Sequence, residues 1–76
     1  MRVTLNIEAL EALNMPIIGN GGFQSFMRKL QNQCQNGVLT YDDADLQTLI
    51  GYSNNYGSGG YENRFRAILD CINEIW

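Results

Sequence analysis

The chain has 76 residues, 45% of them hydrophobic, which allows one small domain with a core of its own. Five basic and eight acidic residues give a net charge of −3. Five cations are too few to neutralise a track of phosphates, so direct binding to duplex DNA is not expected. Nine Asn and five Gln carry much of the polar character instead, and such amides can hydrogen-bond a partner without stripping water from charges.

The start of the chain has no apolar run of the kind found in a leader peptide, and no stretch has the length and hydrophobicity of a membrane helix. Cys34 and Cys71 both lie in apolar helical patterns, which predicts buried free thiols rather than a disulfide framework. These features predict a cytoplasmic protein that does not bind membranes.

Residues 2–7 are ambiguous, because Val3, Leu5 and Ile7 alternate with polar residues as in a strand. Asn6 could also cap a short helix that reaches Leu13. We expect a brief extended lead followed by that helix. Pro16 then ends it, because the residue before proline avoids helical geometry.

A glycine cluster at residues 19–22 opens a helix predicted over residues 22–36. Its apolar side chains recur at helical spacing. They are Phe23, Phe26, Met27, Leu30 and Cys34. The pair Asn36-Gly37 is typical of a helix C-terminus.

After a short apolar connector, Thr40 and Asp43 resemble a capping box for a helix over residues 42–54. A run of aspartates in its first turn, Asp42, Asp43 and Asp45, favours the helix start electrostatically. A second glycine cluster at residues 57–60 opens a last helix over residues 60–75, which has a long apolar face. The sequence therefore predicts an all-α domain of three to four helices spanning residues 1–76.

The two glycine clusters belong to one repeated pattern, Gly-x-Gly-Gly-aromatic-x-x-x-apolar-Arg-x-apolar. Gly19 corresponds to Gly57 at an offset of 57 − 19 = 38 residues, and Arg28 corresponds to Arg66. The recurrence predicts a pseudo-symmetric pair of turn-helix units.

Two interpretations of the glycine turns stay open. Glycine permits a tight turn and close helix packing. A glycine-rich helix start can also hold an anion. The anion-binding candidates are Gly21, Gly22, Gly59, Gly60, Arg28 and Arg66. The Lys-Ser/Thr ending of a nucleotide-binding P-loop is missing, so nucleotide hydrolysis is not expected.

Tyrosines and asparagines alternate around the end of the third predicted helix and the second glycine turn. These residue types suit protein recognition. The partner-binding candidates are Tyr52, Asn54, Asn55, Tyr56 and Tyr61. The same tyrosines could instead pack at the edge of the core, with their hydroxyl groups in water.

Catalytic and metal-binding patterns are missing from the sequence. There is no histidine, and no Ser or Cys has an evident base partner. The aspartate run lacks the glycine and the terminal glutamate of a calcium loop. We therefore expect neither an enzyme nor a cofactor or metal site.

In its general character — very small, catalytically bare, rich in amides — the chain resembles short proteins of bacteriophages and mobile elements, including anti-CRISPR and other anti-defence proteins. The resemblance implies a non-enzymatic inhibitor or adaptor that binds a larger protein such as a host defence complex. A binder of nucleotides or other small anions at the glycine turns is the second hypothesis. A helix-turn-helix nucleic-acid binder is the third, and the low count of basic residues argues against it. The sequence leaves self-association open.

Overall fold

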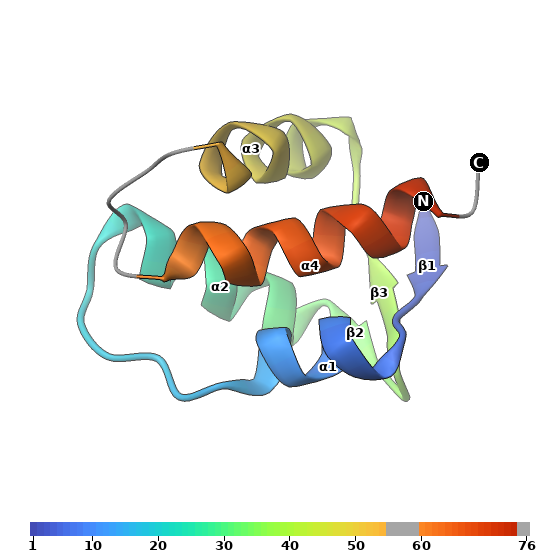
Figure 1. Ribbon diagram of the computed structural model, residues 1–76, viewed down its shortest axis with the longest axis horizontal. Coiled ribbons are helices and arrows are strands. Elements are labelled where there is room, and N and C mark those ends of the chain that lie inside the picture. Colours follow the sequence, from blue (N-terminus) through green and yellow to red (C-terminus); the bar gives the residue numbers. More distant parts are fainter. Residues whose placement is uncertain (55–59, 75–76) are drawn as a thin grey trace.

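The computed structural model of the chain describes residues 1–54 and 60–74 (Figure 1). In chain order the described elements are β1 (Arg2–Thr4), α1 (Ile7–Asn14), α2 (Gly22–Asn32), β2 (Cys34–Gln35), β3 (Val38–Thr40), α3 (Asp43–Ser53) and α4 (Tyr61–Asn73). They form a compact, mostly helical domain with a radius of gyration of 11.1 Å. The predicted predominance of helix is confirmed for this part of the chain.

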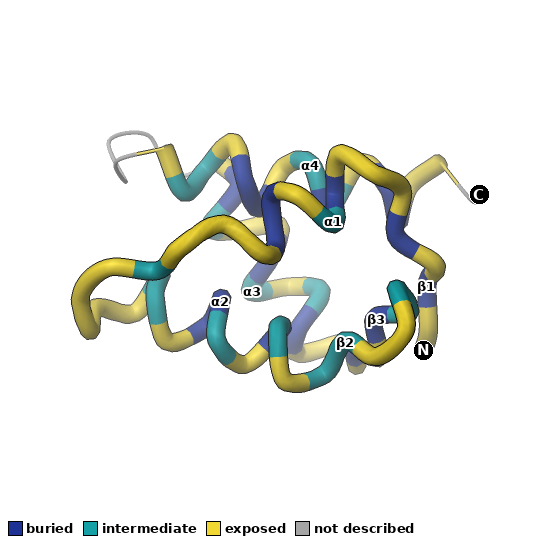
Figure 2. The backbone as a smooth tube through the Cα atoms, turned by 90° about the horizontal axis from the view of Figure 1, so that it is seen from below, coloured by how far each residue is buried: buried dark blue, intermediate teal, exposed yellow. Residues whose placement is uncertain are grey.

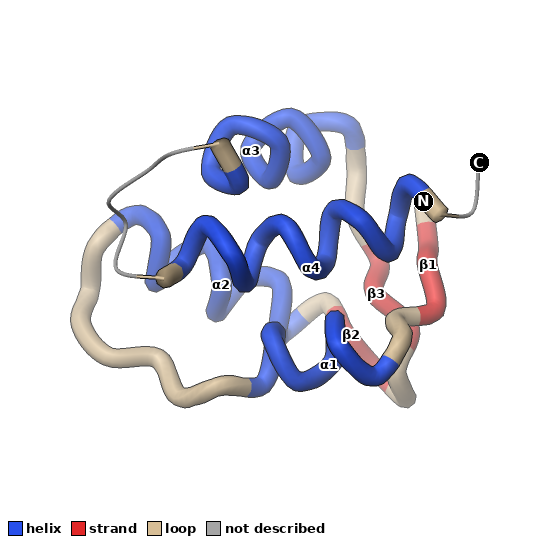
Figure 3. Tube along the Cα trace, viewed as in Figure 1, coloured by secondary structure: helices blue, strands red, loops and turns tan. Residues whose placement is uncertain are grey.

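The three strands form one antiparallel sheet in the order β1-β3-β2, at the end of the molecule where the N-terminus lies (Figure 3). Leu39 in the central strand pairs with Val3 on one side and with Cys34 on the other. These three inward positions are apolar and the outward ones are mostly polar, as expected for a sheet with one face on the core. The brief extended lead is therefore a real strand over Arg2–Thr4, followed by helix α1, and the all-α expectation is wrong on this point.

The helix predicted over residues 22–36 ends at Asn32, and its expected last turn is strand β2. Asn36 and Gly37 form the two-residue loop between β2 and β3, with φ of 54° and 78°. A tight hairpin turn of the I′ type requires positive φ at both positions, which Asn-Gly tolerates best. The pair signalled a hairpin, not a helix C-terminus.

The predicted cap of α1 is confirmed, because the Asn6 side chain accepts a hydrogen bond from the Ala9 N–H at 2.8 Å. The capping box of α3 lies two residues later than predicted. It joins Asp42 and Asp45 rather than Thr40 and Asp43, since Thr40 belongs to strand β3. Helix α3 itself matches the prediction closely.

Helix α4 runs through the middle of the fold, between α1 and α3, and buried positions alternate with exposed ones along each helix (Figures 1 and 2). The fully enclosed large side chains are Phe65, Leu13, Met27, Leu30, Leu39, Leu49 and Ile68. Cys71 is buried on α4 as predicted, whereas Cys34 is half-buried on β2; both are free thiols. Cys71 also accepts a hydrogen bond from the Asn6 N–H at 3.4 Å, which helps to hold the start of α1 against α4.

Both glycine clusters precede a helix, but their backbones differ. Gly21, the cap of α2, is extended with φ −71°, whereas Gly60, the cap of α4, is left-handed with φ 91°. Phe23 and Tyr61, the corresponding aromatics, stack on each other at 6.5 Å between ring centroids. Because residues 57–59 lie outside the described part, the pseudo-symmetry of the two units stays a prediction.

Candidate functional site

The described members of the predicted tyrosine and asparagine surface have internal contacts. The half-buried Tyr52 packs its ring edge-on against Phe23 and Phe26, with centroids 4.8 and 5.5 Å apart. Asn54 donates to the Ile50 carbonyl at 3.1 Å and accepts from Arg66 at 3.3 Å. Asn55 and Tyr56 lie outside the described residues. Tyr52 is thus part of the aromatic packing between α2, α3 and α4.

The anion-binding candidates on α2 are also engaged internally. The Gln24 amide folds back over the glycine turn and donates to the Ile18 carbonyl at 3.2 Å. A Cβ at Gly21 would lie only 2.6 Å from the Gln24 amide oxygen, so that side chain covers the helix start. Gly22 faces the Tyr52 hydroxyl.

The two candidate arginines donate hydrogen bonds to different carbonyl groups. Arg28 donates to the Gly19 carbonyl at 2.9 Å, and Arg66 donates to the Ser53 carbonyl at 2.8 Å. Gly60 remains at the start of α4, and Gly59 lies outside the described residues. The arginines therefore tie loop and helix ends to the fold.

Sequence reasoning missed the most deeply placed arginine, Arg64. It is 8% exposed, and it donates to the carbonyls of Ala12, Met15 and Pro16 at 2.8, 2.9 and 3.3 Å. Ala12 lies in the last turn of α1 and Met15 is its C-cap. Arg64 therefore binds carbonyls that the helix end leaves unsatisfied, together with that of Pro16 beyond it. The Arg64 guanidinium also lies over the Tyr61 ring, 4.9 Å from its centroid. One sequence signal existed, because Arg64 follows Tyr61 by three residues and so belongs to the buried stripe of α4.

The contacts of Arg64 and Cys71 place α1 antiparallel to α4, and three adjoining depressions follow the boundary between these helices. The first, of about 490 Å³, extends from Leu5 to Leu10 and includes Glu74. The second, of about 410 Å³, shares Glu8 with it. The third, of about 330 Å³, shares Met15, Gly60 and Arg64 with the second. Together they form what we call the α1–α4 groove.

Exposed apolar side chains line this groove. Ile7 is 74% exposed, Met15 50% and Ile18 81%, and each of them lines at least one of the three depressions. Tyr61, one of the predicted partner-binding residues, lies in the same depression as Met15 and Ile18. Isolated exposed apolar residues are ordinary, but their gathering along one concave boundary is typical of a binding surface.

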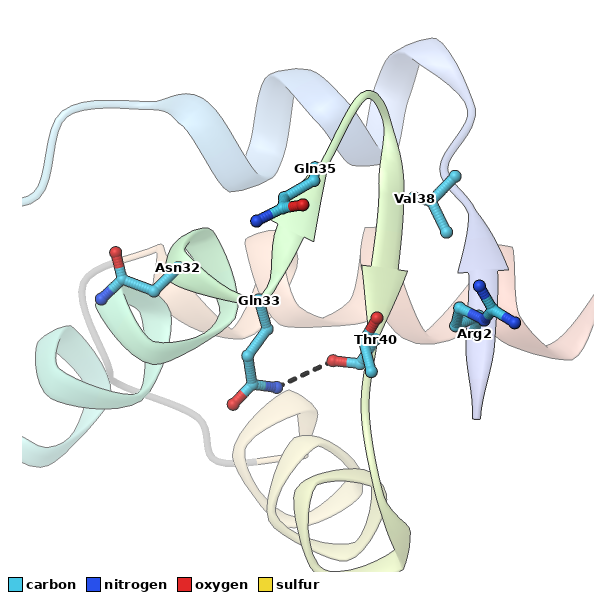
Figure 4. Close-up of a pocket in the computed structure, with 6 residues that line it drawn as sticks. All are labelled: Arg2, Asn32, Gln33, Gln35, Val38 and Thr40. Carbon is cyan, nitrogen blue, oxygen red and sulfur yellow. Dashed lines mark hydrogen bonds between the residues drawn. The ribbon is translucent and has the colours of Figure 1, made fainter.

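A polar pocket of about 330 Å³ lies beside the outer face of the sheet. Figure 4 shows the side chains that line it: Arg2, Asn32, Gln33, Gln35, Val38 and Thr40. Gln33 is committed to the fold, since its amide donates to the Thr40 carbonyl at 2.8 Å and to Asp45 at 3.1 Å. The pocket offers amides, the Thr40 hydroxyl and one guanidinium, which suit hydrogen bonding.

The buried carboxylate of Asp45 is the centre of a charge cluster between α2 and α3. Lys29 donates to it at 2.6 Å, and Gln33 and the Asp42 N–H also donate to it. Burial alone would raise the pKa of Asp45, but these donors outweigh it and lower that pKa below its usual value. The hydrogen bond to Asp45 raises the pKa of Lys29. The cluster is fully satisfied within the chain, so it stabilises the fold.

Over residues 1–54 and 60–74, no three Asp, Glu or Cys side chains come together as a metal-binding group. None of the helices described is long and apolar enough to cross a membrane. Comparison with known protein families, curated proteins and solved structures found no match to this chain. The class of the molecule is therefore defined by its architecture: four helices and a small three-stranded antiparallel sheet in the described part.

Proposed function

We propose that this protein is a non-enzymatic inhibitor or adaptor that binds a larger protein through the α1–α4 groove. The observation that carries the proposal is the gathering of exposed Ile7, Met15 and Ile18 along one concave boundary. Removing such side chains from water on binding is favourable by about 25 cal/mol per Å² of apolar area. In keeping with the resemblance to anti-defence proteins, a host defence complex is the partner that we favour.

The competing hypothesis, an anion or nucleotide binder at the glycine turns, has less support. Arg28 and Arg66 both donate to carbonyl groups of the chain itself, and Gln24 lies over the start of α2. A bound anion would have to replace these contacts. We therefore place the binding surface at the groove, with Tyr61 as the one member of the predicted tyrosine surface that lines it.

The test is affinity capture with a matched pair of variants. Ile18→Asp puts a charge at one end of the groove, and Ile50→Asp puts the same charge at an exposed position of α3. We expect Ile18→Asp to lose a partner that the wild type and Ile50→Asp both capture from a lysate of the native cells. Photo-crosslinking from position 18, but not from position 50, should then identify that partner. Equal capture by both variants would place the binding surface elsewhere and refute this proposal.

A further inference from the structure

Four carboxylates occupy the α1–α4 side of the molecule. Glu8 and Glu11 are three residues apart on α1, and Asp70 and Glu74 are four residues apart, at the C-terminal end of α4. Such spacings place each pair on one face of its helix. All four are exposed, and in the described part of the chain none of them forms an ion pair or accepts a side-chain hydrogen bond.

Three of the basic side chains make their contacts with other groups of the chain. Arg64 lies beneath the groove with its guanidinium on three carbonyls, and Arg66 donates to α3. Lys29 pairs with Asp45 between α2 and α3. The rim formed by Glu8, Glu11, Asp70 and Glu74 therefore faces solvent as a negative surface.

The two ends of the groove differ in charge, although both contain apolar side chains. Glu8 and Glu74 line the end near Asn6, together with the exposed Ile7. Met15, Pro16, Ile18 and Tyr61 line the opposite end. Since α4 has 13 residues, the boundary beside it is about 20 Å long, at 1.5 Å per residue. That length accommodates three to four turns of another helix, and a groove between two helices suits an amphipathic one.

From these features we infer that the occupant of the groove is a basic amphipathic helix of a larger protein. This inference rests on the proposed function and adds the chemistry of the partner. Lys or Arg side chains of the occupant would meet the carboxylate rim, and its apolar side chains would cover Met15 and Ile18. A nucleic acid would bring phosphates to the same carboxylates. A second copy docked by a two-fold axis would set the carboxylate end of one groove either on the carboxylate end or on the apolar end of the other, so neither occupant supplies cations to the rim.

The test uses two synthetic helical peptides of about 16 residues, one with Lys and one with Glu flanking the same leucine stripe. Each is titrated into the ¹⁵N-labelled protein while backbone amide shifts are recorded. We expect the Lys peptide to bind with a Kd on the order of 1 mM or tighter, and to shift amides of α1, residues 15–18 and α4. The Glu peptide should leave those amides unchanged.

A pair of variants with equal net charge separates local pairing from general attraction. Glu11→Gln with Glu74→Gln removes two rim charges, and Gln35→Lys with Gln47→Lys adds two charges at exposed positions elsewhere. Both changes move the net charge from −3 to −1, as −3 + 2 = −1. We expect the rim variant to bind the Lys peptide about tenfold more weakly, and the control variant to lose much less affinity.

Equal binding of the two peptides, no amide shifts at about 1 mM peptide, or shifts confined to the sheet would overturn the inference. An equal loss of affinity in both variants would do the same. If capture of a partner still depends on Ile18 in that case, the proposed function stands and only the basic chemistry of the partner is refuted. Concentration-dependent dimerisation of the protein through Met15 and Ile18 would also overturn it, in favour of a second copy.

Discussion

Helix α4 packs between α1 and α3, and charged side chains have different surroundings on its two sides. We call the side of α2 and α3 the closed side and the side of the α1–α4 groove the open side. On the closed side, the buried charge between α2 and α3 is satisfied internally, with Asp45 bonded to Lys29 and Gln33, and Arg66 is bonded to the end of α3. On the open side, Arg64 is buried beneath the α1–α4 groove, while the carboxylates of its rim form no ion pair within residues 1–54 and 60–74.

The same kind of contact, between an arginine of α4 and carbonyls at a helix end, occurs on both sides of the molecule. Arg64 and Arg66 are two residues apart on α4, and each donates to carbonyls at the C-terminal end of a neighbouring helix. Cations and donors at that end of a helix compensate its unsatisfied carbonyls. Burial distinguishes the two, because Arg64 is 8% exposed and Arg66 lies at the surface. Contacts with donors in low dielectric are stronger and costlier to lose.

The largest expected effect is on the open side. Arg64→Met keeps the apolar stem but leaves three carbonyls without their donor, so it should lower the free energy of unfolding by about 3 kcal/mol. Arg64→Lys should recover less than half of this loss, because one ammonium cannot reproduce the planar fork. Urea denaturation measures both. A loss below about 1 kcal/mol for Arg64→Met would show that burial does not make the contacts of Arg64 costlier to lose than those of Arg66.

The charge cluster on the closed side comes second. Asp45→Asn should cost about 1.5 kcal/mol at neutral pH, because it removes the charge that pairs with Lys29, one of the two acceptor oxygens and a favourable charge in the first turn of α3. Lys29 is 55% exposed, so solvent screening keeps the value modest.

The lowered pKa of Asp45 predicts that its contribution to the free energy of unfolding depends on pH. The pKa of Asp45 is lower in the folded protein than its usual 3.8, so the folded state binds fewer protons there than the unfolded state. The stabilisation is present above that value and is lost as the pH falls through the folded pKa. Urea titrations should therefore show the gap in free energy of unfolding between wild type and Asp45→Asn closing as the pH falls below 3.8. A gap that does not change with pH would mean that charge is not its cause.

The two glycine turns offer the next comparison. Gly60→Ala should destabilise by about 1 kcal/mol, because φ of 91° strains any residue with a Cβ although the surrounding space is open. Gly21→Ala should cost less, since its φ is −71° and only the flexible end of Gln24 must move. Thermal melts of the two variants test this order. The reverse order would mean that packing at Gln24, not backbone strain, dominates the turns.

The smallest effects concern the surface. Arg66→Ala should cost about 0.5 kcal/mol, because its two contacts are close to solvent. Glu11→Gln with Glu74→Gln should leave stability unchanged within about 0.5 kcal/mol, because neither carboxylate has an ion pair to lose. Chemical denaturation of the three proteins checks both. A larger loss for the rim variant would assign its carboxylates to folding rather than to binding.

Local signals in the sequence determined most of the helical framework. Asn6 caps α1, Pro16 follows its end, and helices α3 and α4 lie close to the ranges that their spacing predicted, although Ile50 of α3 is exposed. These features follow from contacts within a few residues along the chain, so the sequence alone is sufficient for them.

Tertiary structure decided the sheet and the candidate site. Val3, Leu39 and Cys34 become strand positions only when β1 pairs with β3 across 36 residues of chain, from Val3 to Leu39. Asn36-Gly37 is compatible with a helix end and with a hairpin, and only that pairing selects the hairpin. The groove likewise requires α1 and α4 to meet, which sets Arg64 on the end of α1 and leaves Glu8, Glu11, Asp70 and Glu74 outside. A pattern along one helix indicates which face is buried but not which distant segment covers it, because packing partners are chosen in three dimensions.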